Sequence, residues 1–511
     1  MIVIGGRDIC LEDFQQIIFG QETVSLDPEA FSAVNDSFLF LKDFSKNKII
    51  YGINTGLGPM SQYKVQEKDR QALQYNLIRS HAAGMGEPIS EIHVKALMVA
   101  RLNTLMKGYS GIHPSVVELL RDFINHDITP VIPRHGGVGA SGDLVQLAHL
   151  ALALIGEGEV TVRGTRMATE EALRKAGLEP VKMHIREALS LINGTSVMSG
   201  IGIVNVIRAK RLLQWAVAAS ALINEVVESY DDHFSLELNR VKLHPGQQEI
   251  TGMLQNILAD SRLTRKRAED LFNGTNGETV FTKKIQEYYS LRCITQILGP
   301  VADTIHAAER VVLNEINSVN DNPVIDHRNG NVFHGGNFHG DYISLEMDKL
   351  KLAITKLSML AERQLNFLMN DKLNGKLPPF VNLGTLGLNL GMQGTQFTAT
   401  STVAENQSLS NPVYIHSIPT NNDNQDIVSM GTNAALLTGR VIRNSFEVMS
   451  IHLLTLMQAV DHLKIRNRMS TFTGGIYDAL RARVPAFADD HYMSPDLRKI
   501  NEYISNNSLN I

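Results

Sequence analysis

A glycine-rich segment in the first third of the chain has a spacing that several kinds of binding loop use. The string Gly137-Val-Gly-Ala-Ser-Gly142 matches GxGxxG and precedes an apolar, helix-like run from Asp143 to Ile155. A dinucleotide-binding fold needs a buried strand before the first glycine, but prolines and charged residues precede it here. A phosphate-binding loop would close with a lysine, whereas Asp143 would repel phosphate. The string alone therefore indicates a tight turn, with Ser141 or Asp143 capping a helix.

The tripeptide Ala140-Ser141-Gly142 changes this interpretation. In His135-Gly-Gly-Val-Gly-Ala-Ser-Gly-Asp-Leu-Val-Gln-Leu, it resembles the signature of the histidine, phenylalanine and tyrosine ammonia-lyases, where Ala-Ser-Gly cyclises to 4-methylidene-imidazole-5-one (MIO). The residue types suit this reaction, because the unhindered Gly142 nitrogen can attack the Ala140 carbonyl and Ser141 can lose water to leave a methylidene group. The product is an electrophile that ordinary side chains do not supply. The resemblance implies MIO as the cofactor, with no metal and no nucleotide.

A second glycine-rich segment, Tyr51-Gly-Ile-Asn-Thr-Gly-Leu-Gly58, resembles the family's loop with a catalytic tyrosine. Once the amine is activated, a base must remove a barely acidic β-proton, and the resemblance makes Tyr51 that base. Taken alone, a tyrosine beside such a turn is more often a packing residue. Asn193, in Leu-Ile-Asn-Gly-Thr-Ser, matches an asparagine that hydrogen-bonds near the prosthetic group, although an Asn-Gly pair is also a common turn.

Further matches lie in the second half of the chain. Tyr289-Ser-Leu-Arg292 resembles the family's Tyr-Ser-x-Arg element, and the three-residue spacing puts both side chains on one face of a helix. The resemblance implies that Arg292 binds the substrate carboxylate through two hydrogen bonds and that Tyr289 supports the prosthetic group. Without the resemblance, Arg292 would be an ordinary surface charge.

Three more segments supply candidate substrate-binding residues. Gly335-Gly-Asn-Phe-His matches a family segment, which implies that Asn337 and Phe338 line the pocket. Ala-Glu405-Asn also matches, and Glu405 is a candidate for contact with the substrate amine or ring. Gln425, in Asn-Gln-Asp-Ile-Val-Ser-Met, is assigned to substrate binding, although this polar run also suits a cap before the helix expected near Asn433.

The ring specificity depends on Ser80 and His81. In this family, the identity of the two residues after the Asn-Leu-x-x run correlates with the substrate ring, and Ser-His is the pair typical of histidases. His81 can hydrogen-bond either an imidazole or a phenolic hydroxyl. Histidases, however, carry Gln-Glu-Asp-His before Val-Ser-Met, where this chain has Asn-Gln-Asp-Ile427. We therefore rank L-tyrosine first, L-histidine second and phenylalanine third, because a phenyl ring would leave His81 unpaired.

The resemblance implies an ammonia-lyase that converts tyrosine to trans-4-coumarate, or alternatively histidine to urocanate. An aromatic aminomutase, which re-adds ammonia at the β-carbon, stays open, because the two reactions differ in how long the product stays enclosed. A helical scaffold without catalytic activity is a third hypothesis, but it leaves the glycine-rich loops unexplained.

Long helices are predicted to position these residues. Apolar residues recur at three- and four-residue steps in Glu346–Asn370 and Ile442–Leu463, and the latter run is a bundle seam or a subunit contact. Similar patterns cover Val197–Ser229 and Ile285–Ile316, and Gly299-Pro300 should kink the last of these. We predict a mainly α fold: a long-helix bundle at residues 191–511 and a loop-rich N-terminal portion at 1–190, packed as one compact structural unit. The resemblance implies the fumarase/aspartase-like superfamily architecture and a homotetramer.

Composition narrows the setting. The 511 residues include two cysteines, which is too few for a disulfide framework and favours a reducing, cytoplasmic environment. The net charge of −5 comes from scattered residues, which argues against nucleic acid or an anionic membrane as a partner. Apolar stretches stay below the ~20 residues that span a bilayer. His334, His339 and Asp341 are metal-ligating types, but the chain has no HExxH motif. A small-molecule enzyme is the class that remains.

Overall fold

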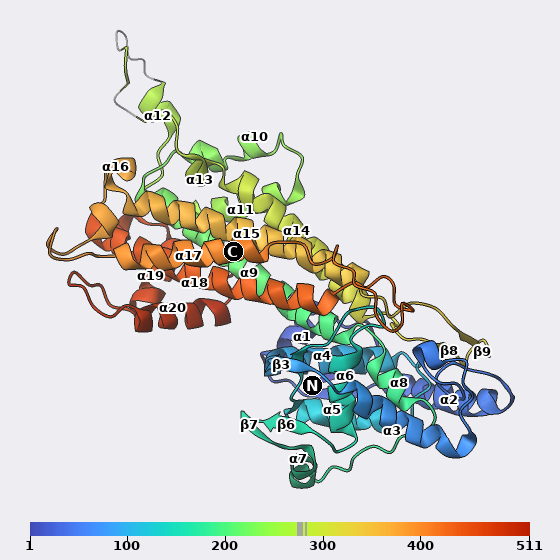
Figure 1. Ribbon diagram of the computed structural model, residues 1–511. Coiled ribbons are helices and arrows are strands. Elements are labelled where there is room, and N and C mark those ends of the chain that lie inside the picture. The colour runs from blue at the N-terminus through green and yellow to red at the C-terminus, as the bar shows by residue number, and fades with distance from the viewer. Residues whose placement is uncertain (273–278, 282–283) are drawn as a thin grey trace. The chain divides into compact units, whose positions relative to one another are not determined.

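Helices make up most of the chain in a computed structural model that describes residues 1–272, 279–281 and 284–511 (Figure 1). The predicted mainly α fold is confirmed. The described residues group into two compact units, each assembled from three stretches of chain. Unit 1 comprises Met1–Ile207, Ala308–Asp348 and Pro412–Thr438, and unit 2 comprises Arg208–Ala307, Lys349–Asn411 and Gly439–Ile511. The division of the chain at residue 190 stays a prediction.

Unit 1 is built around a helix, α4, that is buried on nearly all its faces, because Val94 and most residues from Ala96 to Met106 are apolar and inaccessible. Helix α5 packs on α4, and α6 packs on α3 and α8. The bounds are α1 Leu11–Ile18, α2 Pro28–Phe44, α3 Arg70–His81, α4 Glu91–Met106, α5 Ser115–Asn125, α6 Leu144–Leu154, α7 Thr169–Ala176 and α8 Glu187–Ile192.

Short strands connect these helices. β1 (Ile2–Ile4) pairs in parallel with β2 (Val24–Leu26), and the other pairs are antiparallel: β3 (Met85–Pro88) with β5 (Pro133–His135), β6 (Glu159–Val162) with β4 (Ile128–Pro130) and β7 (Thr165–Ala168), and β8 (Val324–Asp326) with β9 (Asn331–Phe333). In the β3–β5 pair, Met85 lies opposite His135. Because α3 ends at His81 and the glycine-rich loop starts at Gly136, this pairing brings both segments to one side of unit 1.

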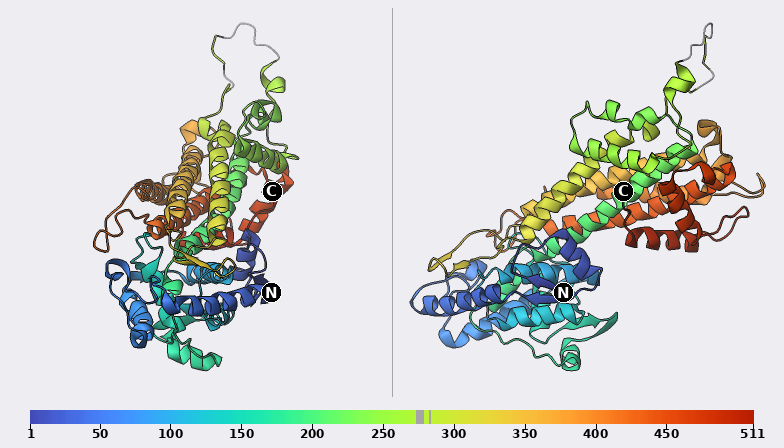
Figure 2. Two further views of the ribbon diagram at one scale, coloured as in Figure 1. Left: turned by 90° about the vertical axis from the view of Figure 1, so that its right-hand side faces the viewer. Right: turned by 180° about the vertical axis from the view of Figure 1, so that it is seen from behind.

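Unit 2 is a bundle in which long helices run side by side (Figure 2). Polar side chains join the helices inside the bundle. Asn406 of α17 donates to Ser358 of α15 (Asp341–Met369) and to Ser445 of α18 (Gly431–Leu463), both at 3.2 Å. The shorter helices of unit 2 are α10 Leu236–Asn239, α11 Pro245–Leu258, α12 Arg267–Leu271, α13 Tyr289–Arg292, α16 Asp371–Asn374, α17 Gln393–Leu409, α19 Thr471–Arg481 and α20 Ser494–Asn506.

The long helices predicted from periodicity are present with shifted ends, and each begins in one unit and ends in the other. They are α9 Ser196–Val226, α14 Ile294–Ile316, α15 Asp341–Met369 and α18 Gly431–Leu463. The prediction of one helix from Ile285 differs from the structure, where α13 ends at Arg292 and α14 starts at Ile294. Between them, Cys293 departs from helical geometry with ψ at 24°. Pro300 lies inside α14, where it removes one backbone hydrogen bond.

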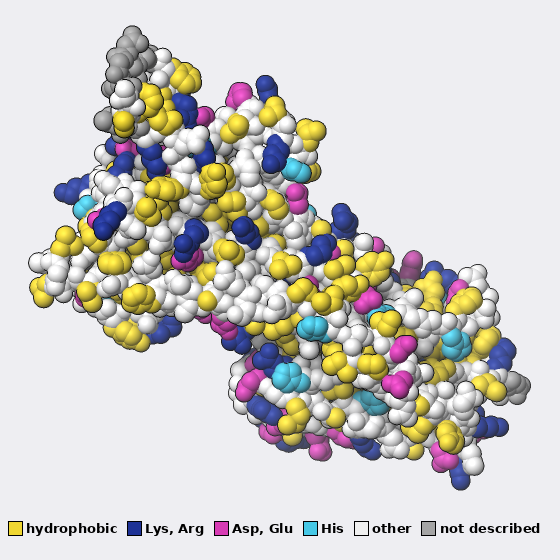
Figure 3. All heavy atoms as spheres, turned by 45° about the horizontal axis from the view of Figure 1, so that its top comes forward, with side chains coloured by type: hydrophobic (Ala, Val, Ile, Leu, Met, Phe, Trp, Pro, Cys, Tyr) yellow, Lys and Arg dark blue, Asp and Glu magenta, His cyan; other side chains and the backbone are white. Residues whose placement is uncertain are grey.

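The apolar seam predicted on α18 is used inside the chain. Its members Ile442, Phe446, Met449 and Leu453 are all buried in unit 2, so the seam belongs to the bundle and is not free to contact a partner. Exposed side chains of both charge signs are scattered over the face in Figure 3. Among the described residues, no helix combines the length and the apolar character that a membrane span requires.

Candidate active site

A cavity of about 840 Å³ in unit 1 gathers seven of the residues that the sequence predicted for catalysis or binding. They are Tyr51, Ser80, His81, Ser141, Asn193, Phe338 and Gln425. Apolar side chains supply much of the remaining wall, among them Leu73, Leu77, Leu144, Leu189 and Ile192. An apolar pocket with a few converging polar groups suits a small molecule that carries an aromatic ring.

The loop that carries Ser141 requires glycine at two positions. Gly139 and Gly142 have φ angles of 78° and 71°, in the left-handed region. A Cβ atom on Gly142 would lie 1.9 Å from the carbonyl oxygen of Gly194, and one on Gly139 would lie 2.0 Å from Oγ of Ser429. Neighbouring backbone therefore closes tightly around this turn, and Ala140 beside it is buried.

Asp143 anchors the end of this loop. Its backbone N–H donates to the oxygen of Gly194 at 2.8 Å, and its fully buried carboxylate accepts the N–H groups of Val197 and Met198, both at 2.9 Å, and the hydroxyl of Thr432. Burial raises the pKa of Asp143 to about 6, although these hydrogen bonds oppose the rise. The structure thus corrects the predicted cap: Asp143 makes no side-chain cap to α6, which follows it, but caps the first turn of α9.

Two amide side chains converge on Ser141. Nδ2 of Asn193 donates to the Ser141 carbonyl oxygen at 3.3 Å, and Nε2 of Gln425 donates to the Ser141 hydroxyl at 2.8 Å. Oδ1 of Asn193 is buried and has no hydrogen-bond partner among the described residues. A ring formed from Ala140, Ser141 and Gly142 would fit this environment. The two donors and the unpartnered oxygen surround it, and the turn has glycine at the two positions that require it.

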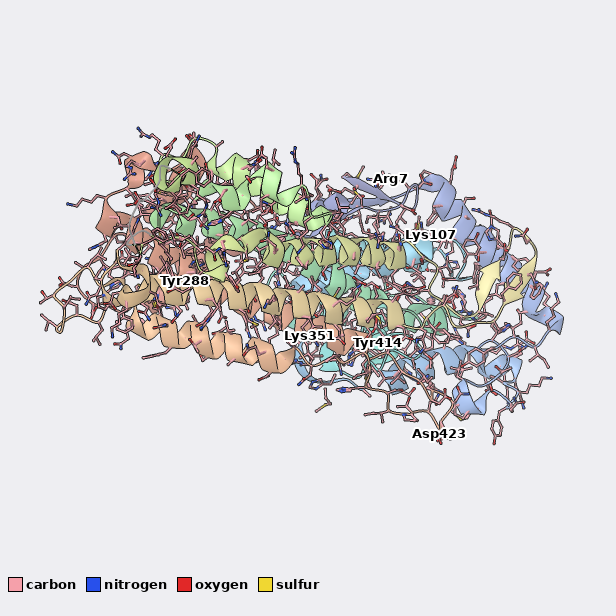
Figure 4. All side chains as sticks on the ribbon, turned by 90° about the horizontal axis from the view of Figure 1, so that it is seen from above. Arg7, Lys107, Tyr288, Lys351, Tyr414 and Asp423 are labelled. Carbon is pink, nitrogen blue, oxygen red and sulfur yellow. The ribbon has the colours of Figure 1, made fainter. Side chains whose placement is uncertain are left out.

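The loop from 420 to 425 orients Gln425. Thr420 donates to Oε1 of Gln425 at 3.0 Å, which leaves the Nε2 end of the amide for Ser141. Asn421, Asn422 and Asp423 follow one another with φ between 53° and 59°, a conformation that Asn and Asp tolerate better than most residues. Asp423 is exposed (Figure 4). The unusual backbone therefore serves to turn Gln425 back towards the cavity.

Tyr51 reaches the same cavity from the other glycine-rich loop. Its hydroxyl oxygen accepts the backbone N–H of Gly58 at 2.9 Å, at the start of the short helix η2 (Gly58–Met60). This donor remains available when the hydroxyl gives up its proton. Gly52 brings the loop close to α8, because a Cβ there would lie 2.5 Å from Cδ2 of Leu189.

His81 is the last residue of α3, and the contacts of its ring indicate which ring nitrogen carries the proton. Nδ1 lies 3.0 Å from the carbonyl oxygen of Leu77 and 3.0 Å from the hydroxyl of Ser80. Since a carbonyl oxygen only accepts, we assign the proton of the neutral ring to Nδ1. Nε2 is then the hydrogen-bond acceptor of this ring, and His81 lines the cavity.

Asn337 and three residues of unit 2 do not line this cavity. The side-chain amide of Asn337 donates to the oxygen of Val319 at 3.2 Å.

In unit 2, the Arg292 guanidinium stacks 4.8 Å from the Tyr289 ring centroid, and no carboxylate among the described residues pairs with it. Glu405 forms an ion pair with Arg440 and accepts from Asn444 at 3.2 Å. The predicted roles of these four residues stay predictions.

Some cavity residues had no role in the prediction. Asn322, His334 and Asn421 line the wall, and the sequence had singled out only His334, as a metal-ligating type. They come from irregular loops, where no periodicity signals which way a side chain faces. Leu77 could have been found, because it precedes His81 by one helical turn. Among the described residues, no group of three or more His, Cys, Asp or Glu is placed to hold a metal ion.

Comparison with known proteins adds independent findings. A family model described as aromatic amino acid lyase matches residues 9–482. Tyrosine 2,3-aminomutase of Chondromyces crocatus is 40% identical, over 95% of this chain and 93% of that protein. Histidine ammonia-lyase of Geobacillus sp. is 37% identical, over 99% of this chain and 96% of the other. The solved structure of Pantoea agglomerans phenylalanine aminomutase superimposes with a TM-score of 0.95 at 35% identity, covering 99% of both chains. The predicted fumarase/aspartase-like architecture is thereby confirmed.

Proposed function

Because the chain belongs to the aromatic amino acid lyase family, we propose that it is an MIO-dependent ammonia-lyase that converts L-tyrosine to trans-4-coumarate. The observation that carries the proposal is the placement of Ser141. Its hydroxyl accepts a hydrogen bond from the amide of Gln425 and its carbonyl oxygen accepts one from the amide of Asn193. Tyr51 and His81 line the same cavity. The residues that we propose as base and ring-recognition group thus line the same cavity as Ser141.

Ala140, Ser141 and Gly142 would form the prosthetic group, and Asn193 and Gln425 would hold it. When formed, the group supplies an electrophilic methylidene carbon that captures an amine and makes the amino group a better leaving group. Asn193 donates to the carbonyl oxygen of Ser141, where negative charge is expected to develop, and a donor already in place there costs no reorganisation during the reaction.

Tyr51 acts as the general base in this proposal. The Gly58 N–H donates to its oxygen and fixes the direction in which that oxygen faces the cavity. A positioned base of this kind contributes about 10²–10⁴-fold to a proton-transfer step. The β-proton of the substrate would pass to the Tyr51 oxygen as the carbon–nitrogen bond breaks.

His81 selects the ring. Its Nε2 accepts a hydrogen bond, so a phenolic hydroxyl donates to it, while Phe338, Leu77 and Leu189 enclose the apolar part of the ring. An imidazole N–H is also a donor, which keeps L-histidine as the second substrate candidate. A phenyl ring has no donor and would leave Nε2 without a partner on the substrate.

Arg292, Tyr289, Glu405 and Asn337 are assigned to the same reaction by resemblance. An arginine without a carboxylate partner among the described residues suits a substrate carboxylate, which it would bind with two parallel hydrogen bonds. We propose a homotetramer in which more than one chain contributes residues to each site. Exposed apolar side chains such as Tyr342 and Phe397 would be buried in such an assembly. The expected setting is the cytoplasm, with neither nucleic acid nor membrane as a partner.

An aminomutase is the second candidate. It is favoured because the relative that is 40% identical is named a tyrosine 2,3-aminomutase. The chain's own residues would perform the same elimination, followed by return of ammonia to the β-carbon of the retained product. The two activities therefore share every residue discussed above and differ in product release.

Parallel assays with L-tyrosine, L-histidine and L-phenylalanine test the proposal. We expect the highest kcat/KM with tyrosine, equal amounts of ammonia and trans-4-coumarate, and no β-amino acid by chromatography. If β-tyrosine were the main product, the enzyme would be an aminomutase and not an ammonia-lyase. Faster turnover of histidine would reverse the substrate ranking, and a chain inert to all three would contradict the proposal as a whole.

A further inference from the structure

Arg101 is a buried cation that contacts no buried anion among the residues the structure describes. It lies on α4, its side chain is 0% exposed, and burial lowers its pKa to about 10, so that it stays protonated at neutral pH. Among the described residues, no carboxylate lies within ion-pair distance of its guanidinium. A buried charge is costly unless the surroundings compensate it, so its contacts indicate what it is for.

Two of those contacts are backbone carbonyl oxygens at the end of α8, and a third is the side-chain oxygen of Asn320. Nη2 donates to the oxygens of Ser190 and Asn193, the latter at 2.8 Å, and Nη1 lies 3.5 Å from Oδ1 of Asn320. The C-terminal carbonyls of a helix carry partial negative charge, which favours a cation. Arg101 therefore fixes the backbone at the residue whose side chain donates to Ser141.

The next residue links Arg101 to the glycine-rich turn. Gly194 leaves room for the guanidinium, because a Cβ there would lie 2.5 Å from Nη1 of Arg101. On its other side, the Gly194 oxygen accepts the N–H of Asp143 and limits the position of Gly142, whose hypothetical Cβ it would meet at 1.9 Å. The chain of contacts thus runs from Arg101 through Gly194 to Gly142.

Several other charged side chains are buried around this backbone. Arg186 pairs with Asp321 at 2.9 Å, with both side chains fully buried. Asp321 and, to a smaller extent, Asp143 favour the charged form of Arg101, and Arg101 in turn favours the charged form of Asp143. Loss of Arg101 would remove one of the groups that favour the charged form of Asp143 at the start of α9 and leave its hydrogen bonds as the rest.

We propose that Arg101 is a positioning residue for maturation of the site: it holds Asn193 and Gly194 against Gly142 so that the Gly142 nitrogen meets the Ala140 carbonyl carbon. This inference rests on the proposed function. The bond that forms joins that nitrogen to that carbon. The Ala140 oxygen leaves as water with the amide hydrogens of Gly142 and Ser141. The Ser141 hydroxyl leaves as a second water with the Cα hydrogen of Ser141, and no oxidant or reductant is consumed.

Intact-protein mass spectrometry of the folded fraction tests this role without measuring activity. The variants are Arg101→Met, which removes the charge, and Arg101→Lys, which keeps the charge but cannot reach both carbonyls. Arg211→Met is the matched control, because Arg211 is a buried arginine of unit 2 that also donates to a backbone carbonyl, that of Ser505. Gel filtration and circular dichroism select the folded protein before weighing.

We expect wild type and Arg211→Met to weigh two waters less than their sequences. In folded Arg101→Met, the dehydrated fraction should form about a hundredfold more slowly, as a misplacement of about 1 Å would produce, with Arg101→Lys between the two. Full dehydration of folded Arg101→Met at the wild-type rate would overturn the inference. Failure of both Arg101 variants to fold would also overturn it, by assigning Arg101 to the core alone. A wild-type protein that keeps both waters would instead refute the proposed function.

Discussion

If His81 selects the ring as we propose, replacing it with phenylalanine should shift the substrate preference from tyrosine towards phenylalanine. The carbonyl of Leu77 lies 3.0 Å from Nδ1, to which we assign the ring proton, and we propose that Nε2 accepts a hydrogen bond from the phenolic hydroxyl. Phenylalanine at this position removes the acceptor and leaves the hydroxyl of bound tyrosine against an apolar ring. A polar group buried without its partner costs about 1–3 kcal/mol, or about 5- to 150-fold in kcat/KM for tyrosine.

The same change should improve phenylalanine as a substrate. In the wild-type pocket, its phenyl ring leaves Nε2 of His81 unpaired, and the replacement removes that penalty. We expect a gain of about tenfold for phenylalanine, so that the ratio of the two kcat/KM values shifts by about 50-fold or more. Initial rates with both amino acids, followed by the absorbance of each conjugated acid, give this ratio directly.

Ser80→Ala is the matched control for this prediction. It removes the neighbouring hydroxyl but keeps the His81 ring and its contact with Leu77, so the ratio should move by less than about threefold. If His81→Phe leaves the ratio as little changed as the control does, Nε2 is not the partner of the phenol. Our assignment of the ring-recognition residue would then be wrong.

Three further substitutions test other parts of the account. Tyr51→Phe should lower kcat about 10²–10⁴-fold with little change in KM, because it removes the base and leaves the ring pocket intact; steady-state kinetics with tyrosine measures both. Gln425→Glu should lower kcat with every substrate about 5- to 150-fold, because a carboxylate cannot donate the hydrogen bond that Nε2 of Gln425 gives at Ser141; the three-substrate assay reports it. His452→Leu should raise the free energy of unfolding at pH 7 by about 1–3 kcal/mol in urea titrations, because neither buried ring nitrogen of His452 has a partner among the described residues. Burial lowers the pKa of His452 to about 3 from its usual 6.5, so the unfolded chain binds a proton over that interval and the folded chain does not. Wild-type stability should therefore fall by up to about 5 kcal/mol more than that of His452→Leu as the pH drops from 6.5 towards 3.

Periodicity alone predicted the long helices well. The three- and four-residue steps hold in α15 and α18 because apolar residues on one broad face of each helix are buried, which forces them to recur. The break at Cys293 was missed, since a single residue that departs from helical geometry leaves the apolar pattern around it unchanged. The α18 seam was also ambiguous, because an internal seam and a subunit contact have the same spacing.

The cavity was predictable only through the resemblance. Tyr51, His81, Ser141 and Gln425 are far apart in the sequence and lie on separate loops and helix ends, so no local pattern indicates that they meet. Arg101 was missed for a different reason. Helix α4 is buried on nearly all faces, so its sequence shows no polar side from which one buried charge would stand out.

The cap made by Asp143 shows a third limit. From sequence, a polar residue directly before a helix is taken as the cap of that helix, but the carboxylate of Asp143 bonds to the first turn of α9 instead. Tertiary packing decided between two helix starts that the sequence could not distinguish.

The central claim is that Ser141 becomes part of the catalytic electrophile. The most direct measurement compares ammonia release from L-tyrosine by wild type and by Ser141→Ala, with both proteins shown to be folded by circular dichroism. The account predicts ammonia and trans-4-coumarate from wild type, and a loss of at least about 10³-fold in kcat for the variant, which cannot form the methylidene carbon. Ammonia release by Ser141→Ala at a rate near that of wild type would contradict it.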